Sequence, residues 1–200
     1  MGRVSTARER LVQATIDLIW TGSYGAVSVD AICEHAKVKK GSFYHFFKSK
    51  DDLVIAALEA HWEGRKPTLD ELFAPSHPPL ERLRRYFENV FRRQSDMALK
   101  FGRPPGCLYG KVGVEVGGDS EIGKTVQRIM AAYVAYYESA LADAAAEGIP
   151  IVDVPGKARA LFAYMEGVLT QARIQDDHEI MKNLGKSAFQ FLGIDYVKAA

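Results

Sequence analysis

Apolar residues recur every three or four positions along almost the whole chain, which is the period of an α-helix rather than a β-strand. The residues that share one face of a first helix, over 7–20, are Leu11, Ala14, Thr15, Leu18 and Ile19. The same period continues in four later segments, 79–100, 120–148, 155–174 and 177–193. Strand-like sequence is short and confined to 149–154, and 107–116 fits either structure. The sequence therefore predicts an all-α protein.

Four prolines between residues 67 and 79 interrupt the helical pattern. Proline lacks an amide hydrogen and clashes with the preceding turn, so it is unfavourable inside a helix. Upstream of them, Ser49 followed by Asp52 resembles a capping box at the start of a longer helix. We expect that helix to end at about Lys66 and 67–79 to be an irregular linker.

The composition is typical of a globular protein: 200 residues, 48% of them hydrophobic and 26% charged. No apolar run approaches the length of about 18 residues that a membrane span needs, so we expect no membrane partner. The first ten residues lack the apolar core of a signal peptide, and two cysteines do not make a disulfide framework. These features favour a cytoplasmic location.

Positive charge is concentrated at the start of the chain. Residues 1–50 carry eight Lys or Arg and four Asp or Glu, whereas the remainder carries 18 and 21. A basic first quarter suggests that one small unit meets a polyanion, although a solvated lysine-rich face would look similar.

Two short helices with a tight turn between them are predicted within this basic part. Ser28 can cap a helix over 29–36, with Asp30 in its first turn, where the helix dipole favours an anion. After the turn, Lys40 to about Phe46 forms a second short helix. Behind an amphipathic first helix, this arrangement is a helix-turn-helix unit, which inserts its second helix into the DNA major groove.

The second of these helices begins with residue types suited to a DNA surface. Lysines can bind phosphates, hydroxyls can donate hydrogen bonds, a glycine permits close approach, and a helix N-terminus can accept a phosphate. The candidate DNA-binding residues are Ser28, Lys39, Lys40, Gly41, Ser42, Tyr44, His45 and Lys50. Aromatic residues at helical spacing are also typical of a core, so we assign Phe43 and Phe47 to packing and leave Phe46 open.

Residues 8–53 resemble the DNA-binding domain of the TetR family of transcriptional regulators. The resemblance rests on ARERLVQATIDLI and YGAVSVDAICEHAKVKKGSFYHFFKSKDDL. It implies a homodimer that binds a double-stranded DNA operator, with a three-helix head over residues 1–53. It also implies an all-α regulatory and dimerisation domain over 54–200, which binds a small-molecule or electrophilic inducer.

Two positions depart from the family pattern. The family commonly has glycine where this chain has Lys37 and serine where it has Lys39. Glycine eases a backbone conformation with positive φ, so we expect Lys37 to adopt it at some strain. The added charge predicts stronger, more salt-dependent DNA binding and puts Lys39 in question as a specific contact.

The segment PPGCLYGKVGVEV, residues 104–116, contains a candidate sensing cysteine. If Cys107 starts a helix, nearby amide groups and Lys111, four residues on, would make its thiol more reactive. A small buried hydrophobic residue is the alternative interpretation of Cys107. We expect Cys33, in mid-helix, to be inert packing.

That segment is also similar to a TetR branch that includes the repressor of N-ethylmaleimide reductase. Members of the branch can have lysine where this chain has Arg173. Arginine is a poor nucleophile toward an oxidised thiol, so a Cys–Lys type of linkage is doubtful here. Two interpretations of this segment stay open: Arg173 holds the Cys107 thiolate, or the segment simply binds a ligand.

Aromatic residues of the second half could line a cavity for an apolar or planar ligand, or could be plain core. They are, with one methionine, Trp62, Phe101, Tyr109, Tyr133, Tyr137, Phe162, Tyr164 and Met165. The last two helices could pair with those of a second copy. We expect that interface to contain Leu161, Met165, Leu169, Ile180, Leu184, Ala188 and Phe189.

No catalytic motif for acyl, phosphoryl or dinucleotide chemistry is present, and the five histidines lack metal-ligand spacing. We therefore expect no enzyme activity, no cofactor and no metal site. The prediction is a sequence-specific DNA-binding regulator, a repressor released by a small ligand or by cysteine modification. The alternatives are a helical ligand-binding or interaction protein that does not bind DNA, or a small helical enzyme.

Overall fold

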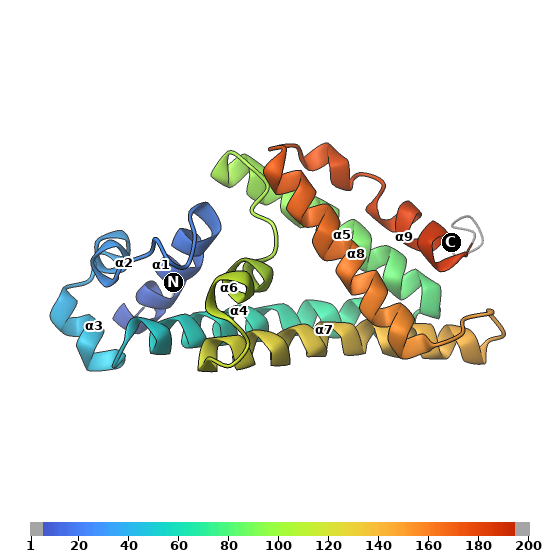
Figure 1. Ribbon diagram of the computed structural model, residues 1–200, viewed down its shortest axis with the longest axis horizontal. Helices are drawn as coiled ribbons and strands as arrows, with labels where there is room; N and C mark the ends of the chain where they lie inside the picture. The colour runs from blue at the N-terminus through green and yellow to red at the C-terminus, as the bar shows by residue number, and fades with distance from the viewer. Residues whose placement is uncertain (1–5, 195–200) are drawn as a thin grey trace. The chain divides into compact units, whose positions relative to one another are not determined.

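The computed structural model describes residues 6–194, which form nine α-helices and one 3-10 helix and contain no strand (Figure 1). The helices are α1 (Ala7–Thr21), α2 (Val29–Ala36), α3 (Lys40–Phe46), α4 (Lys50–Leu72), α5 (Pro79–Phe101), α6 (Leu108–Val116), α7 (Glu121–Ala146), α8 (Val154–Ile174), η1 (His178–Met181) and α9 (Leu184–Leu192). The all-α prediction is confirmed. The ambiguous segment 107–116 is helical from Leu108 onward, and 149–154 forms no strand.

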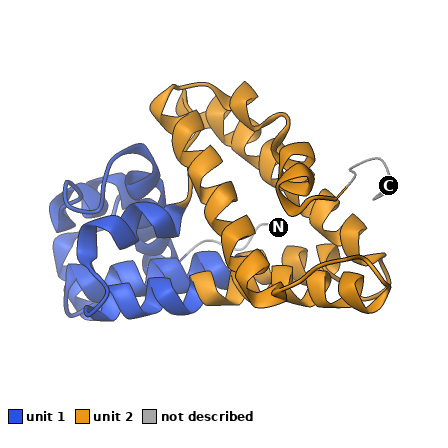
Figure 2. Ribbon diagram, turned by 45° about the vertical axis from the view of Figure 1, so that its right-hand side comes forward, with its two compact units in different colours: residues 1–64, 108–129 blue, residues 65–107, 130–200 orange. Residues whose placement is uncertain are grey.

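The chain divides into two compact units (Figure 2). The first unit comprises residues 1–64 and 108–129, and the second comprises 65–107 and 130–200. Helices α4 and α7 each contribute residues to both units. Parts of the expected domains lie outside the described residues, namely 1–5 and 195–200. The first of these ranges is also the start of the stretch that was inspected for a signal peptide.

The helices of the first unit begin where local capping residues predict. Thr6 and Glu9 form a complete capping box at the start of α1. The Ser28 hydroxyl accepts the Ala31 amide hydrogen at 3.1 Å, and α2 and α3 have the predicted bounds. The cap of α4 is only partly as expected. The Asp52 amide donates to Ser49, but the Asp52 carboxylate accepts from Lys48 rather than from Ser49.

The predicted end of α4 at Lys66 is wrong, because the helix continues through Pro67 to Leu72. Pro67 cannot donate the backbone bond expected of a residue inside a helix. It lies on an exposed face, where water can solvate the local backbone, while Leu69 and Phe73 are buried just beyond it. Burial of these two side chains favours continuation of the helix despite the proline.

In the second unit, α5, α8, η1 and α9 pack against one another. The expected single helix over 177–193 is two elements, because the chain turns at Lys182 and Asn183 and buries both Met181 and Leu184.

Burial contradicts six of the seven predicted dimer-interface residues. Six of the seven, namely Leu161, Met165, Leu169, Leu184, Ala188 and Phe189, are buried in the chain's own core. The outward side of these helices instead carries Ala163, Gly167, Thr170, Ile174 and Phe191. The sequence pattern identified the apolar face correctly, but that face packs within the chain rather than toward a partner.

Two neighbouring aromatic residues of α3 provide a test of the first unit's core. Phe43 is fully buried, whereas Phe46 is 40% exposed. We expect Phe43→Ala to lower the free energy of unfolding by about 3–5 kcal/mol, through lost burial and the cavity left behind. The matched change Phe46→Ala should alter it by no more than about 0.5 kcal/mol. Urea denaturation of both variants measures the difference, and equal losses would contradict this assignment of the core.

Candidate nucleic-acid interface and regulatory core

The turn between α2 and α3 has the backbone geometry that the sequence predicted. Lys37 has φ 53° and ψ 47°, in the left-handed region. Its amide donates to Glu34 at 3.0 Å, and the Val38 amide donates to Cys33 at 2.9 Å, which closes the end of α2. Cys33 itself is buried, and burial raises the pKa of its thiol, in keeping with inert packing.

The outer side of α3 presents most of the candidate DNA-binding residues to solvent. Lys39, Lys40, Gly41, Tyr44 and His45 are exposed, and Tyr44 is 58% exposed. Ser42 is half-buried. A Cβ atom placed on Gly41 would meet no atom within 4 Å, so the protein's own packing does not require glycine there. An open glycine on a helix that begins with two lysines suits the close approach of an outside partner.

Three of the candidate DNA-binding residues, Ser28, Lys40 and Lys50, already have partners in the protein. Ser28, which is exposed, uses its hydroxyl as the cap of α2. Lys40 forms a 2.7 Å ion pair with Asp30, and the hydrogen bond between them raises the pKa of Lys40. Lys50 donates to the Tyr24 carbonyl oxygen at 3.2 Å and lies 4.1 Å from the centre of the Tyr24 ring. A phosphate would compete with Asp30 for Lys40, and Lys50 also orders the turn before α2.

Helix α6 belongs to the first unit and is hydrogen-bonded to the turn between α1 and α2. The Lys111 ammonium donates to the carbonyl oxygens of Ile19 at 2.5 Å and Trp20 at 2.9 Å, at the C-terminal end of α1. A cation is favourable there because the helix dipole leaves partial negative charge. The Glu115 carboxylate accepts the amide hydrogens of Tyr24 at 3.1 Å and Gly25 at 2.8 Å. We call these four hydrogen bonds the α6 clamp.

The α6 clamp was missed in the sequence, where Lys111 was interpreted as a neighbour of Cys107 and Glu115 was given no role.

Two residues predicted for the ligand cavity, Trp62 and Tyr109, are buried in the first unit. The Tyr109 hydroxyl lies 2.8 Å from His61 Nδ1, and the His61 ring packs edge-on against Trp20. Trp62 and Tyr109 thus form part of the first unit's packing.

Three other predicted cavity residues, Tyr133, Tyr137 and Phe162, gather in the second unit, whereas the Tyr164 ring stacks on Phe191. Phe162 lies 6.3 Å from Tyr133 and 6.0 Å from Tyr137, measured between ring centres, and Met165 is buried beside them on α8. The structure adds three aromatic residues that the sequence analysis did not choose: Phe73, Tyr86 and Phe87 all have ring centres within 6.1 Å of Tyr137. We call these rings the aromatic core.

Glu166 is the main functional candidate that sequence reasoning missed. It lies largely buried on α8, and burial raises the pKa of its carboxyl, while a hydrogen bond from the Cys107 thiol opposes that rise. Its Oε1 atom is buried without a hydrogen-bond partner, as is Arg65 Nε. The clue was available, since Glu166 is a single acid among the apolar residues of LFAYMEGVL.

The loop that carries Cys107 is held from two sides. The buried Gln94 side chain donates to the Gly106 carbonyl oxygen at 3.0 Å and accepts the Gly106 amide hydrogen at 3.2 Å. Arg173 donates to the Pro105 carbonyl oxygen at 3.3 Å, and burial lowers the pKa of Arg173. Gly106 has φ 76°, a conformation that favours glycine. Arg173, for which a hold on the thiolate was left open beside simple ligand binding, supports the backbone just before Cys107.

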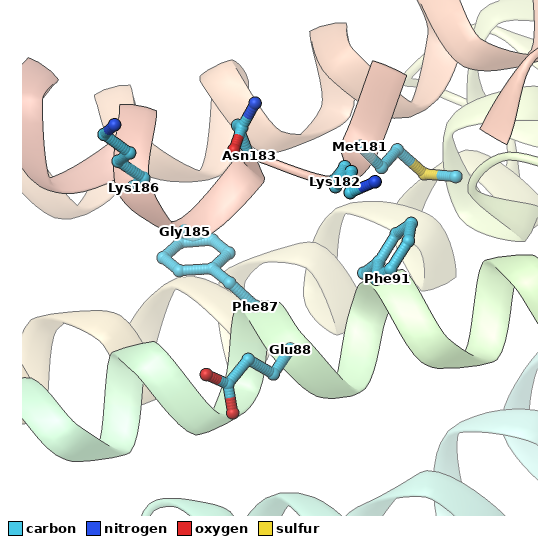
Figure 3. Close-up of a pocket in the computed structure, with 8 residues that line it drawn as sticks. All are labelled: Phe87, Glu88, Phe91, Met181, Lys182, Asn183, Gly185 and Lys186. Carbon is cyan, nitrogen blue, oxygen red and sulfur yellow. The ribbon is translucent and has the colours of Figure 1, made fainter. Parts of the chain in front are cut away.

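A separate pocket of about 160 Å³ lies between α5 and the η1–α9 segment (Figure 3). Phe87, Phe91 and Met181 supply its apolar wall, and Lys182 and Lys186 lie along the α9 side. None of the residues predicted to bind a ligand lines this pocket. Among residues 6–194, no cluster of three His, Cys, Asp or Glu could hold a metal ion. No helix in that range is long and apolar enough to cross a membrane.

Comparison with known proteins agrees with this geometry. Residues 11–57 match the family model of bacterial regulatory proteins, tetR family, and residues 79–187 match the tetracyclin repressor-like C-terminal domain. The head with its helix-turn-helix and the helical second half are thus those of a DNA-binding transcriptional regulator. Since the second match alone spans more than half of the sequence, the chain belongs to the tetR family.

Two named relatives are similar over about half of the chain. Identity is 36% over 115 residues with the transcriptional regulator AcuR of Cereibacter sphaeroides, covering 56% of this chain and 50% of the relative. Identity is 28% over 110 residues with the repressor NemR of Escherichia coli, covering 54% and 53%. The matches therefore span about half the length of each relative.

Solved structures match along nearly the whole chain. A regulatory protein TetR from Rhodobacter sphaeroides has a TM-score of 0.82 at 26% identity, covering 93% of this chain and 98% of that one. The reduced form of Escherichia coli NemR has a TM-score of 0.80 at 24% identity, covering 92% and 95%. At 24% identity, the similarity to the NemR structure shows that the two proteins share a fold.

Replacing Lys111 tests the α6 clamp. We expect Lys111→Met to lower the free energy of unfolding by about 1–2 kcal/mol, because two carbonyl oxygens at a helix end lose a cation. Amide exchange should speed up in the last turn of α1. The control is Lys124→Met, which removes only an exposed ion pair with Glu121 and should cost at most about 0.5 kcal/mol. Equal effects of the two changes would contradict a specific role for Lys111.

Tyr24 should make stability depend on alkaline pH. Burial, and then the hydrogen bond to Asp51, raise the pKa of Tyr24 from 10.0 to about 12. A raised folded-state pKa means that the stabilisation is complete below pH 10 and is lost as pH rises through about 12. Urea denaturation across this window should therefore show a steeper loss of stability for the native chain than for Tyr24→Phe. Parallel curves would show that Tyr24 ionises normally.

Proposed function

We propose that this protein is a homodimeric repressor that binds a double-stranded DNA operator through two copies of the α2–α3 unit. In this proposal residues 1–53 contact DNA and residues 54–200 regulate and dimerise, in the cytoplasm. The observation that carries it is the exposed start of α3, where Lys39, Gly41 and Tyr44 face solvent above a buried Phe43. That arrangement suits insertion into a major groove.

The charge of the α3 surface supports a nucleic-acid partner over a protein partner. Four exposed lysines lie within twelve residues of sequence: Lys37, Lys39, Lys40 and Lys48. Each lysine that neutralises a phosphate releases counterions, which predicts strongly salt-dependent binding. Asp30 already pairs with Lys40, so this lysine contributes less than a free one would.

Regulation is proposed to reach the head from the second unit. Its aromatic core, with Cys107 and Glu166, is the proposed site of a small ligand or of thiol modification. The similarity to AcuR and NemR, both named as transcriptional regulators, supports this class of function and the NemR-like branch in particular. Inducer binding and operator binding are coupled thermodynamically. An inducer that favours a dimer state in which the two α3 helices no longer match two successive major grooves must weaken operator binding.

Operator binding is measured by fluorescence anisotropy with DNA from upstream of the protein's own gene, at several salt concentrations. We expect Tyr44→Ala to weaken selective binding by about 1–3 kcal/mol, because the exposed Tyr44 ring would lose its proposed contacts in the groove. Lys39→Ala should weaken binding to all sequences alike and reduce the salt slope by about 1. Lys186→Ala, an exposed lysine of the second unit, is the control and should change neither.

The proposal fails if no fragment upstream of the gene is bound selectively. It also fails if Lys39→Ala and Lys186→Ala behave alike, because the basic surface of α3 would then be unused. Treatment with N-ethylmaleimide, compared between the native chain and Cys107→Ser, separates the two routes of induction. Release that requires Cys107 supports thiol modification, and release by a reversible ligand alone supports the other route.

A further inference from the structure

The pocket between α5 and the η1–α9 segment lies within the second unit and has an apolar wall (Figure 3). Phe87 and Phe91 are four residues apart on α5, so they share one face of the helix. Figure 3 shows both rings pointing toward η1–α9. Met181, at the end of η1, completes the wall. Phe87 and Met181 are buried, so this wall is part of the core of the unit.

The size of the pocket restricts what it can hold. Its volume of about 160 Å³ is close to that of an engineered apolar cavity of about 150 Å³ that binds benzene. Drug-sized ligands occupy pockets of roughly 300 Å³ or more. The volume therefore limits a ligand to a single six-membered ring or a short chain.

Positive charge lies along the α9 side of the pocket. Lys182, Asn183 and Lys186 line it there, and all three are exposed to solvent. Lys182 already pairs with Glu179 at 3.2 Å. Lys186 has no ion-pair partner among residues 6–194, so it is the lysine available to an anion in the pocket.

The acid that borders the pocket does not cancel this charge. Figure 3 shows the Glu88 side chain directed away from η1–α9, and its carboxylate pairs with Arg84 at 2.5 Å. Glu179 is committed to Lys182 in the same way. An anion at the α9 side of the pocket therefore meets Lys186 without a competing carboxylate from the lining residues.

The first turn of α9 adds hydrogen-bond donors on the same side. Asn183 is the N-cap residue, but its side chain makes no capping hydrogen bond. The Ser187 amide donates to the Asn183 carbonyl oxygen at 2.9 Å, and the amides of Gly185 and Lys186 before it have no acceptor within the helix. Amides at a helix N-terminus and the helix dipole both favour an anion.

We propose that this pocket binds a small aromatic carboxylate, that is, a single ring bearing one carboxylate group. The ring packs against Phe87, Phe91 and Met181, and the carboxylate accepts hydrogen bonds from the α9 amides and the Lys186 ammonium. An aromatic ring is favoured over a short aliphatic chain because aromatic pairs gain edge and face contacts beyond simple burial. A carboxylate is favoured over a neutral group because charge-assisted hydrogen bonds are roughly twice as strong as neutral ones.

The inference goes beyond the proposed function, because the site is separate from Cys107 and shares only Phe87 with the aromatic core. It is tested without DNA. The intact protein is titrated with benzoate by isothermal titration calorimetry and by ¹H–¹⁵N NMR. We expect a dissociation constant of about 0.1–1 mM, as suits a ligand of so few atoms. The amides of Gly185 and Lys186 should shift downfield as they donate to the carboxylate.

Three further ligands separate the contribution of the ring from that of the charge. Benzyl alcohol keeps the ring without the charge, and acetate keeps the charge without the ring. Each should bind at least about tenfold more weakly than benzoate. Hexanoate replaces the ring by a chain and should also bind more weakly than benzoate.

Two variants test the two sides of the pocket. Lys186→Gln should weaken benzoate by about five- to tenfold and leave benzyl alcohol unchanged. Lys100→Gln, which removes an exposed lysine of α5 outside the pocket, is the matched control and should bind benzoate as the native chain does. Phe91→Ala should weaken benzoate and benzyl alcohol alike, and circular dichroism confirms that it is folded. Operator binding by Lys186→Ala is measured without benzoate, so that comparison is independent of this pocket.

The proposal is overturned if benzoate does not bind at about 20 mM, or if Lys186→Gln binds it as tightly as the native chain. It is equally overturned if the shifted amides gather around Tyr137 instead of the start of α9, because benzoate would then occupy the aromatic core. Tighter binding of hexanoate than of benzoate would show that the aromatic class is wrong. None of these results bears on the repressor proposal, which fails or stands on operator binding alone.

Discussion

Burial of enough apolar surface is the constraint on which the head depends. Three helices of about fifty residues bury only a modest fraction of their surface, so their stability is marginal. The first unit meets this need by adding the start of α4 and the whole of α6, whose Leu108, Tyr109 and Val112 are buried. The α6 clamp then fixes the direction of this added helix against the end of α1. Helices α1 to α3 are therefore stabilised by a segment that lies far from them in sequence.

The second unit solves a different problem, because its interior mixes rings with polar groups. Tyr137 is surrounded by Phe73, Tyr86, Phe87 and Phe162, and packing of this kind would be most stable if it were wholly apolar. A buried carboxyl oxygen without a partner, Glu166 Oε1, lowers the stability of such a core. In a regulator, a molecule that bound such a group in only one of two conformations would shift the equilibrium toward that conformation.

Local signals in the sequence were enough to predict most of the helices, and long-range contacts explain what was missed. Ser28 and Lys37 each fix a backbone conformation through neighbours within four residues, so the cap and the turn could be read directly. Pro67 was misjudged because burial beyond it outweighs a local penalty. Lys111 and Glu166 were misassigned or overlooked because their partners lie about ninety and sixty residues away. One sequence without an alignment carries no record of such pairs.

The α6 clamp also determines how members of this family could be recombined. A hybrid regulator that joined this head to another member's second half at residue 53 would separate Lys111 and Glu115 from the groups they bind at Ile19, Trp20, Tyr24 and Gly25. The transplanted head would keep its recognition residues and lose the helix that completes its core. A functional exchange would have to carry residues 108–129 along with 1–64, so the inheritable module is discontinuous in sequence.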